Sequence, residues 1–310
     1  MRARLLPLLA ALTGLMIVNA GCNKNSTARK TVDLTDDLGR TVSINAPVQR
    51  IVTMAPNLTE ITFAAGAGDK LVGVTTADDY PPEVDSIPRF SAVGVDFEAL
   101  VTMKPDLVLA TDQVNSPKDA DMFASLDIPV LYLSFAGMDD IFDAIKTVGE
   151  VAGTGSRAAD HAGTLREAVV DLGRQTSALT PRPRVLFLIS SDRLFGFGKD
   201  SYVHEIIRTA GGESISAEMD VTAPVFSEEY VIEQAPDVII GAFQDGTDAD
   251  DLLKKYPAWS TVPAIQSGRV YSIDPDIVLR PGPRVVEGAF RMALLLHPDL
   301  LENDASVIRR

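Results

Sequence analysis

The sequence has few of the residues that form cross-links or metal sites. It contains one cysteine and three histidines among 310 residues. A single cysteine cannot form an internal disulfide, so the fold must hold together without one. The histidines, His161, His204 and His297, are far apart in the sequence and do not give the clustered ligands of a zinc or manganese site. We expect no bound metal and no cofactor.

Long apolar runs are also scarce. Residues 5–18 form an apolar stretch that follows Arg2 and Arg4, but proline and glycine interrupt it. No later segment reaches the roughly 18 apolar residues that a membrane helix needs. A positive start followed by a short apolar run is typical of a secretory signal. We therefore predict that residues 1–21 are a signal peptide and that the rest of the chain is exported.

The only cysteine lies directly after this segment. The stretch NAGC, at Ala20, Gly21 and Cys22, resembles the processing site of bacterial lipoprotein precursors, although Asn19 replaces the usual leucine. The resemblance implies that Cys22 is lipidated and anchors the chain to a membrane. Each buried lipid methylene contributes about 0.8 kcal/mol, so two or more acyl chains anchor stably. The alternative is an ordinary signal peptide with an unmodified cysteine. Residues 22–31 are polar and predict a lipidated N-terminus with a flexible spacer.

Basic residues are outnumbered by acidic ones. Without the first 21 residues the chain has 26 basic and 43 acidic residues, a net charge of −17. A surface of this charge repels phosphate backbones. Nucleic acid is therefore not an expected partner.

Two segments of the chain repeat one pattern. The sequence FEALVTMKPDLVLA at 97–110 is matched by EEYVIEQAPDVIIG at 228–241. In each copy a capping residue, Asp96 or Ser227, precedes a short helix that stops at a Pro-Asp turn. The run of Leu, Val and Ile that follows predicts a strand buried on both faces.

The repeat extends outward from these segments. The stretches RIVTMAP and RVLFLIS each open a unit with a buried strand, and PVLYLS and RVYSID each close one. Each unit therefore predicts an α/β lobe of about four short, mostly parallel strands with intervening helices. We place the N-terminal lobe at 32–155 and the C-terminal lobe at 181–310. Two similar lobes suggest a ligand cleft between them.

A single long helix is expected between the lobes, at 156–180. Its apolar positions recur at spacings of three and four residues, and TPRPR ends the pattern. At ~1.5 Å per residue such a helix would be about 35 Å long, enough to cross from lobe to lobe. A rigid connector of this kind limits hinge motion.

Several longer stretches carry a family resemblance. They include DDLGRTVSINAPVQRIVTMAPNLTEITFAAGAGDKLVGVT, DYPPEV, LVTMKPDLVLA, VGEVAGTGSRA, PAWSTVPAIQSGRVYSID and RPGPRVVEG. Over nearly all of its mature length the chain resembles the substrate-binding proteins of bacterial ABC importers for vitamin B12, ferric siderophores and haem. The resemblance implies a two-lobed clamp on a backbone helix, a ligand held between the lobes and delivery to a membrane permease.

Other motifs are weaker. GTGSRA at 153–158 fits a loose dinucleotide pattern, but the segment before it has helical spacing, so we interpret it as a helix-to-helix turn. FGFGKDS lacks the spacing of a phosphate loop. LISSDR has no glycines flanking its serines and no histidine placed to activate them. A bare metal-ion receptor and an exported hydrolase remain the alternatives to a non-enzymatic receptor.

The resemblance also implies ligand-binding residues. The matching positions are Tyr80 in DYPP, Phe195 in RLFGFGK, and Asp276 and Arg280 in DPDIVLRPGPR. An aromatic face can pack on a flat macrocycle, and arginine offers a planar donor fork to carboxylate or amide oxygens. Without the resemblance, Tyr80 would be interpreted as a turn residue and Arg280 as a surface charge.

The tryptophan positions depart from the family pattern. Members that bind cobalamin usually supply tryptophans to the cleft, but the corresponding places here fall near Ala92, Thr111 and Ala223. The only tryptophan, Trp259, lies in PAWSTVPAI and is expected to be structural. A corrinoid is only slightly preferred as ligand over a ferric siderophore or haem.

Two glutamates occupy the same register of the repeat. Glu98 and Glu229 each lie seven residues before the proline of their copy. The structural alternative is that each merely complements its helix dipole, worth about 0.3 to 1 kcal/mol. In the resembled family, glutamates at these positions dock onto arginines of the two permease subunits. The resemblance therefore implies a permease dimer with its ATPase as the partner. We expect the binding protein itself to be a monomer.

Overall fold

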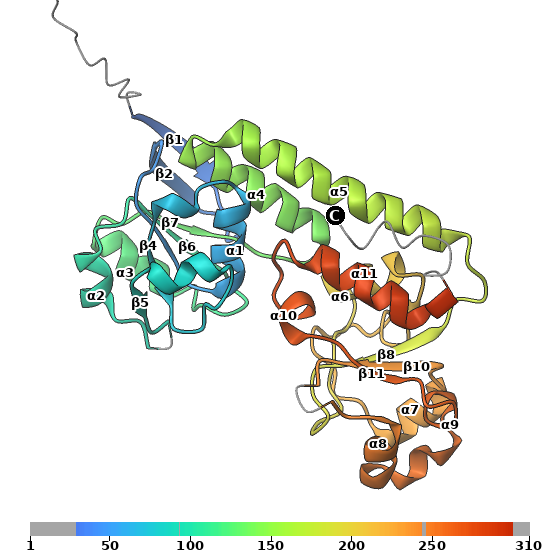
Figure 1. The fold of residues 1–310 in the computed structure, drawn as a ribbon. Coiled ribbons are helices and arrows are strands. Elements are labelled where there is room, and N and C mark those ends of the chain that lie inside the picture. The colour runs from blue at the N-terminus through green and yellow to red at the C-terminus, as the bar shows by residue number, and fades with distance from the viewer. Residues whose placement is uncertain (1–28, 93, 244–245, 300–310) are drawn as a thin grey trace, which may run out of the picture.

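The computed structural model describes residues 29–92, 94–243 and 246–299. Two α/β lobes lie side by side, and helices join them along one side (Figure 1). The two-lobed α/β fold expected from the sequence is confirmed. Within the described residues, no helix combines the length and the apolar character needed to cross a membrane.

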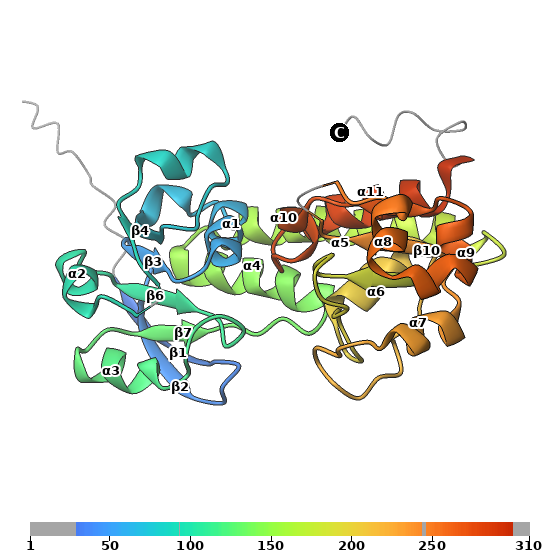
Figure 2. The ribbon, with the colours of Figure 1, turned by 90° about the horizontal axis from the view of Figure 1, so that it is seen from below.

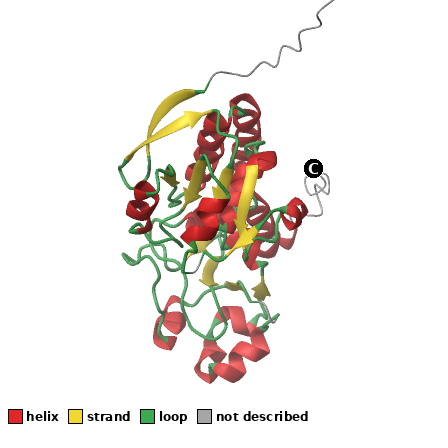
Figure 3. Cartoon of the chain, turned by 90° about the vertical axis from the view of Figure 1, so that its left-hand side faces the viewer, coloured by secondary structure: helices red, strands yellow, loops and turns green. Residues whose placement is uncertain are grey.

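The N-terminal lobe contains a parallel sheet of order β5-β4-β3-β6-β7. Its strands are β3 (Ile51–Thr53), β4 (Leu71–Thr75), β5 (Arg89–Phe90), β6 (Leu107–Ala110) and β7 (Val130–Tyr132). Its helices are α1 (Pro56–Ala64), η1 (Gly68–Lys70), η2 (Pro82–Ser86), α2 (Phe97–Thr102) and α3 (Asp119–Ser125). An antiparallel hairpin, β1 (Lys30–Thr35) with β2 (Thr41–Ala46), lies on the outside of this lobe (Figure 3).

The C-terminal lobe contains a parallel sheet of order β11-β10-β8-β9. Its strands are β8 (Arg184–Leu188), β9 (Glu213–Ser214), β10 (Val238–Gly241) and β11 (Val270–Ser272). Its helices are α6 (Tyr202–Thr209), α7 (Glu228–Gln234), α8 (Ala249–Lys255), η3 (Pro257–Thr261), α9 (Pro263–Gln266), α10 (Pro275–Val278) and α11 (Val285–Leu296).

The repeated segments fold alike, as predicted. The Asp96 carboxylate accepts a hydrogen bond from the backbone N–H of Ala99 at 3.0 Å, and the Ser227 hydroxyl accepts one from Tyr230 N–H at 3.1 Å. These caps satisfy orphan donors at the starts of α2 and α7. All residues of β6 and of β10, the strands that follow, are buried. The start of each copy is therefore determined by local sequence.

Two antiparallel helices connect the lobes. The long helix α5 (Gly155–Ser177) runs beside α4 (Met138–Ala152) (Figure 2). Gly153, between them, has a left-handed backbone conformation. Met138 N–H donates to a Glu205 oxygen of α6 at 2.7 Å, whereas the carbonyl of Ala152 accepts from Lys70 Nζ at 2.7 Å. Helix α4 therefore contacts the C-terminal lobe at its start and the N-terminal lobe at its end. This pairing makes the connection stiffer than a single helix.

The hydrophobic core is shared between the lobes. Alternate residues of a strand point to opposite faces of the sheet. Val185 and Phe187 of β8 join the same cluster as Leu107 and Leu109 of β6, which extends through α4, α5, α6 and α11. The intervening residues of the two strands belong to separate clusters on the outer face of each sheet. One continuous core therefore holds the two lobes together.

Candidate functional site

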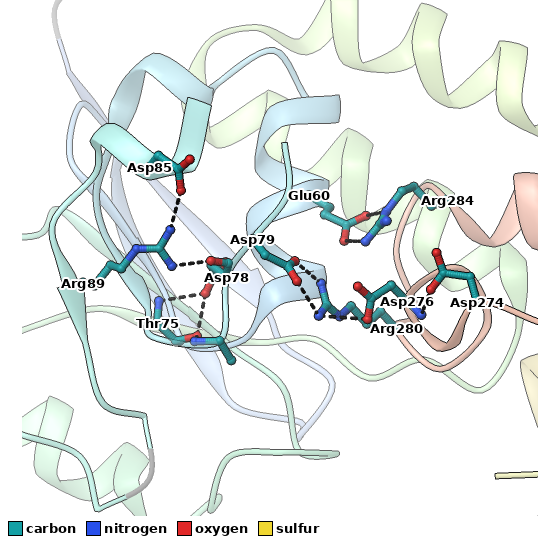
Figure 4. A network of polar contacts seen from close by, with 11 residues as sticks. Glu60, Thr75, Asp78, Asp79, Asp85, Arg89, Asp274, Asp276, Arg280 and Arg284 are labelled. Atoms are coloured by element: carbon teal, nitrogen blue, oxygen red, sulfur yellow. Dashed lines mark hydrogen bonds and ion pairs between the residues drawn. The ribbon is translucent and has the colours of Figure 1, made fainter. Parts of the chain in front are cut away.

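A loop after β4 carries the N-terminal side of the candidate site. Asp78 is buried and accepts hydrogen bonds from Thr75 N–H at 2.8 Å and from the Thr75 hydroxyl at 2.5 Å. These bonds hold the chain as it leaves the carboxyl end of the strand. Asp79 and Tyr80 follow directly, and Tyr80 is 43% exposed. The loop thus presents the Asp79 carboxylate toward the segment around α10 (Figure 4), and Tyr80 follows it in the sequence.

The segment around α10 carries the C-terminal side. Asp274 caps this short helix by accepting from Asp276 N–H at 2.9 Å. Arg280 Nη2 lies 2.9 Å from an oxygen of Asp276, one helical turn earlier. The structure therefore brings together Asp276 and Arg280, two of the residues that the family resemblance implied.

Arg280 also reaches across to the N-terminal lobe. Its Nη1 and Nη2 donate to the two carboxylate oxygens of Asp79, at 2.5 Å and 3.2 Å (Figure 4). The hydrogen bond from Arg280 lowers the pKa of Asp79 below its usual value, and burial only partly opposes this. Burial acts to lower the pKa of Arg280, but the hydrogen bond to Asp79 and the negative charges of Asp276, Asp79 and Glu60 together raise it. Both groups are therefore charged near neutral pH.

A second ion pair crosses the interface beside the first. Arg284 donates from Nε and Nη2 to the two oxygens of Glu60 in α1, at 2.9 Å and 2.7 Å. Burial raises the pKa of Glu60 even though Arg284 opposes the rise. The Arg284 guanidinium lies 4.2 Å from the centre of the Tyr80 ring, within the range of a cation–π contact.

The Glu60–Arg284 pair and Tyr80 border a cavity of about 1040 Å³, which Arg280 does not line. Tyr80, Glu60 and Arg284 contribute to its lining, together with residues of α1, α5 and α11. Apolar side chains such as Phe63 and Phe290 lie there among acidic ones. This volume is at the upper limit of the range of small-molecule sites.

Phe195 occupies a different position. It lies in the loop after β8, is half-buried and forms an isolated antiparallel bridge with Val225. Within the described part of the chain, no hydrogen bond or ring contact joins it to Tyr80, Asp276 or Arg280. The structure thus gathers Tyr80, Asp276 and Arg280 around the two ion pairs between the lobes, and it leaves Phe195 outside this group.

The remaining predicted positions separate into exposed and buried ones. Glu98 and Glu229 are exposed in the first turns of α2 and α7, one on each lobe. Trp259 is fully buried and stacks on Tyr256 with ring centres 4.6 Å apart, so its expected structural role is confirmed. Cys22 lies outside the described residues.

The histidines do not come together. His161 lies on α5, His204 in α6 bonds the carbonyl of Phe197, and His297 at the end of α11 bonds that of Gly211. Among the residues that the structure describes, no group of three or more His, Cys, Asp or Glu could hold a metal ion.

Three residues of the cluster were not predicted from the sequence. Asp79 and Arg284 lie inside the motifs DYPP and RPGPR, next to residues that were chosen. Glu60 is the only charge in the apolar helix α1, a pattern that indicates a buried carboxylate with a distant partner. That pattern could have identified Glu60, although not its partner.

A family model described as periplasmic binding protein matches residues 51–277, most of the chain. The chain belongs to this family. An ABC transporter substrate-binding lipoprotein of Bacillus subtilis, YvrC, is 31% identical over 308 residues, which cover 94% of this chain and 96% of that protein. A vitamin B12-binding protein of Vibrio parahaemolyticus is 28% identical over 243 residues, 78% of this chain and 87% of its own.

Solved structures agree with this assignment. The periplasmic vitamin B12-binding protein BtuF of Vibrio cholerae superposes with a TM-score of 0.70 at 25% identity, covering 83% of this chain and 99% of that one. The periplasmic haem-binding protein RhuT of Roseiflexus sp. RS-1 gives 0.71 at 25% identity, covering 81% and 98%. The resemblance seen in the sequence is therefore confirmed, and this periplasmic binding protein has the fold of transporter binding proteins.

Proposed function

We propose that this periplasmic binding protein captures a corrinoid of the vitamin B12 type outside the cytoplasmic membrane and delivers it to an ABC permease. The observation that carries the proposal is the contact of Arg280 with Asp79 across the lobe interface. A polar cluster between two lobes, with Tyr80 beside it, is suited to hold a ligand that both lobes contact. Several curated relatives that cover more than three quarters of the chain are named vitamin B12-binding proteins.

The proposed ligand residues are Tyr80, Asp276 and Arg280, together with Phe195 in the separate loop after β8. The tyrosine ring would pack on the ligand's flat face, and Arg280 would donate to its carbonyl oxygens. Haem and ferric siderophores are the competing ligands, because related binding proteins carry those names. The protein acts by binding and release, without turnover.

Isothermal titration calorimetry with cyanocobalamin, haemin and a ferric hydroxamate siderophore tests the proposal. We expect saturable binding of cyanocobalamin, weakened at least about tenfold in Arg280→Ala, since a charged hydrogen bond is worth roughly 1.5–3 kcal/mol. Arg174→Ala is the matched control, because Arg174 is an exposed arginine on α5. Binding of haemin or the siderophore without binding of cyanocobalamin would refute the corrinoid assignment.

A further inference from the structure

Arg280 is shared by two carboxylates from different lobes. Both terminal nitrogens bond Asp79, and Nη2 also lies 2.9 Å from Asp276. The neighbouring pair of Glu60 and Arg284 is balanced, one negative charge against one positive. The Arg280 cluster, defined here as Asp79, Asp276 and Arg280, is not balanced. It carries one positive and two negative charges.

The cluster remains accessible from solvent. The Asp79 side chain is 57% exposed, that of Asp276 is 32% exposed and that of Arg280 is 21% exposed. A ligand entering between the lobes can therefore reach both carboxylates and the edge of the guanidinium. Because Arg280 holds the pKa of Asp79 low, the carboxylate stays ionised at neutral pH.

We propose that Asp79 makes the site selective for ligands whose side groups are neutral amides and selects against ligands that carry carboxylates there. This inference rests on the proposed function, and it assigns a specificity role to a residue of the loop after β4. It predicts that the propionamide groups of a corrinoid fit the cluster, whereas the free propionates of haem or the carboxylates of an acidic siderophore do not.

The reason is the hydrogen-bonding chemistry of the two groups. A primary amide has N–H donors and a carbonyl acceptor, so it can donate to Asp79 or Asp276 while it accepts from Arg280. A carboxylate can only accept. It must either displace Asp79 from Arg280 or become a third negative charge around one guanidinium. Like charges brought together at a binding interface are a recognised source of specificity.

A pair of ligands that differ in one group tests this. Cyanocobalamin is compared by calorimetry with a set of its isomeric monocarboxylic acids, in each of which one propionamide is hydrolysed. We expect the wild type to bind cyanocobalamin at least about tenfold more tightly than the isomer whose acid faces the cluster. In Asp79→Asn the affinity for cyanocobalamin should exceed the affinity for that acid by less than about threefold, mainly because the acid binds more tightly than it does to the wild type. This affinity ratio is the measured quantity.

Asp69→Asn is the matched control. Asp69 is an exposed aspartate in η1, which precedes the start of β4, whereas Asp79 follows its end. The control removes the same charge from the same lobe and should keep the wild-type ratio. Asp276→Asn provides a second variant at the cluster, and it should also lower the ratio.

The outcomes separate this inference from the proposed function. If the wild type binds cyanocobalamin and all the monoacids equally, the selectivity role of Asp79 is overturned while corrinoid binding stands. The role is also overturned if Asp79→Asn and Asp276→Asn both fold, as judged by circular dichroism, and keep the wild-type ratio. If the wild type binds no corrinoid, both the proposed function and the inference fail.

Discussion

Glu60 and Arg284 form a two-point ion pair between the lobes, although they are 224 positions apart in the sequence. The Glu60 side chain is only 2% exposed and that of Arg284 is 16% exposed. A buried pair of this kind adds little net stability compared with apolar residues, but removing one partner leaves an uncompensated charge. The pair therefore penalises any arrangement of the lobes that would separate the two charges.

Arg284→Met should destabilise the protein by about 3 kcal/mol at pH 8, the lower end of the range for breaking a buried pair. Burial raises the pKa of Glu60, and loss of Arg284 raises it further because Arg284 opposes that rise. A carboxyl whose pKa is raised in the folded state reduces stability as the pH rises through that pKa. The loss of stability should therefore be smaller at pH 5 than at pH 8. Urea unfolding at both pH values measures it.

Arg291→Met is the control for this prediction. Arg291 lies on α11, the helix that Arg284 directly precedes, and pairs with Glu287 at 3.3 Å, but both side chains are about half exposed. Its substitution should change stability by less than about 1 kcal/mol. An equal loss in the two variants, or a larger loss at pH 5 for Arg284→Met, would contradict the account of the buried pair.

The exposed glutamates of the repeat are proposed to dock on the permease. Glu98→Ala combined with Glu229→Ala should leave ligand affinity within about twofold, because α2 and α7 lie apart from α10, which carries Asp276 (Figures 1 and 2). The double variant should nevertheless abolish uptake in reconstituted vesicles. Hydrogen bonds from its own backbone N–H and from Ser227 lower the pKa of Glu229, which keeps it charged near neutral pH.

The control pair for docking removes the same charge elsewhere on the two lobes. Asp121→Ala and Glu233→Ala change exposed acidic residues of α3 and α7, and neither occupies the repeat position that Glu98 and Glu229 share. This pair should transport normally. Normal uptake by the Glu98 and Glu229 double variant would refute the docking role. Both residues would then only complement the dipoles of their helices.

The proposed lipid anchor gives a prediction that is independent of the fold. Cys22→Ser should leave the lobes folded and release the protein from the membrane fraction, since a serine hydroxyl cannot form the thioether to the lipid. Fractionation and mass spectrometry of the N-terminus measure both effects. Unmodified and fully released wild-type protein would rule out the anchor.

The paired connection of α4 and α5 predicts a small response to ligand. The hydrogen bond from Met138 to Glu205 and the shared core restrict hinge motion. The radius of gyration from X-ray scattering should change by less than about 1 Å on ligand binding. Compaction by several ångströms would indicate a hinge that the helix pair does not allow.

Most of the fold could be predicted because its signals are local. The caps at Asp96 and Ser227, the buried strands after each Pro-Asp turn and the stripe of α5 all depend on residues close together in the sequence. The two-residue strands β5 and β9 lack such signals, because their neighbours in the sheet define them. The sequence also did not predict that α4 would lie along α5.

The candidate site was less predictable for the same reason. Asp79 and Arg280 are 201 positions apart, and nothing in either local sequence identifies the partner. The family motifs indicated Tyr80, Asp276 and Arg280 individually. Their contacts, Tyr80 with Arg284 and Arg280 with Asp79, depend on how the shared core orients the lobes.

The position of Trp259 determines which part of the protein its fluorescence emission reports on. This residue belongs to the cluster on the outer face of the C-terminal sheet, apart from the core that joins the lobes, and stacks on Tyr256. Its emission is therefore a local probe of that outer layer. The far-ultraviolet circular dichroism signal is instead summed over all helices, and the longest of those described, α4 and α5, pack in the shared core. Comparing the two signals during denaturation would show whether the outer layer of the C-terminal lobe unfolds before the core that the two lobes share.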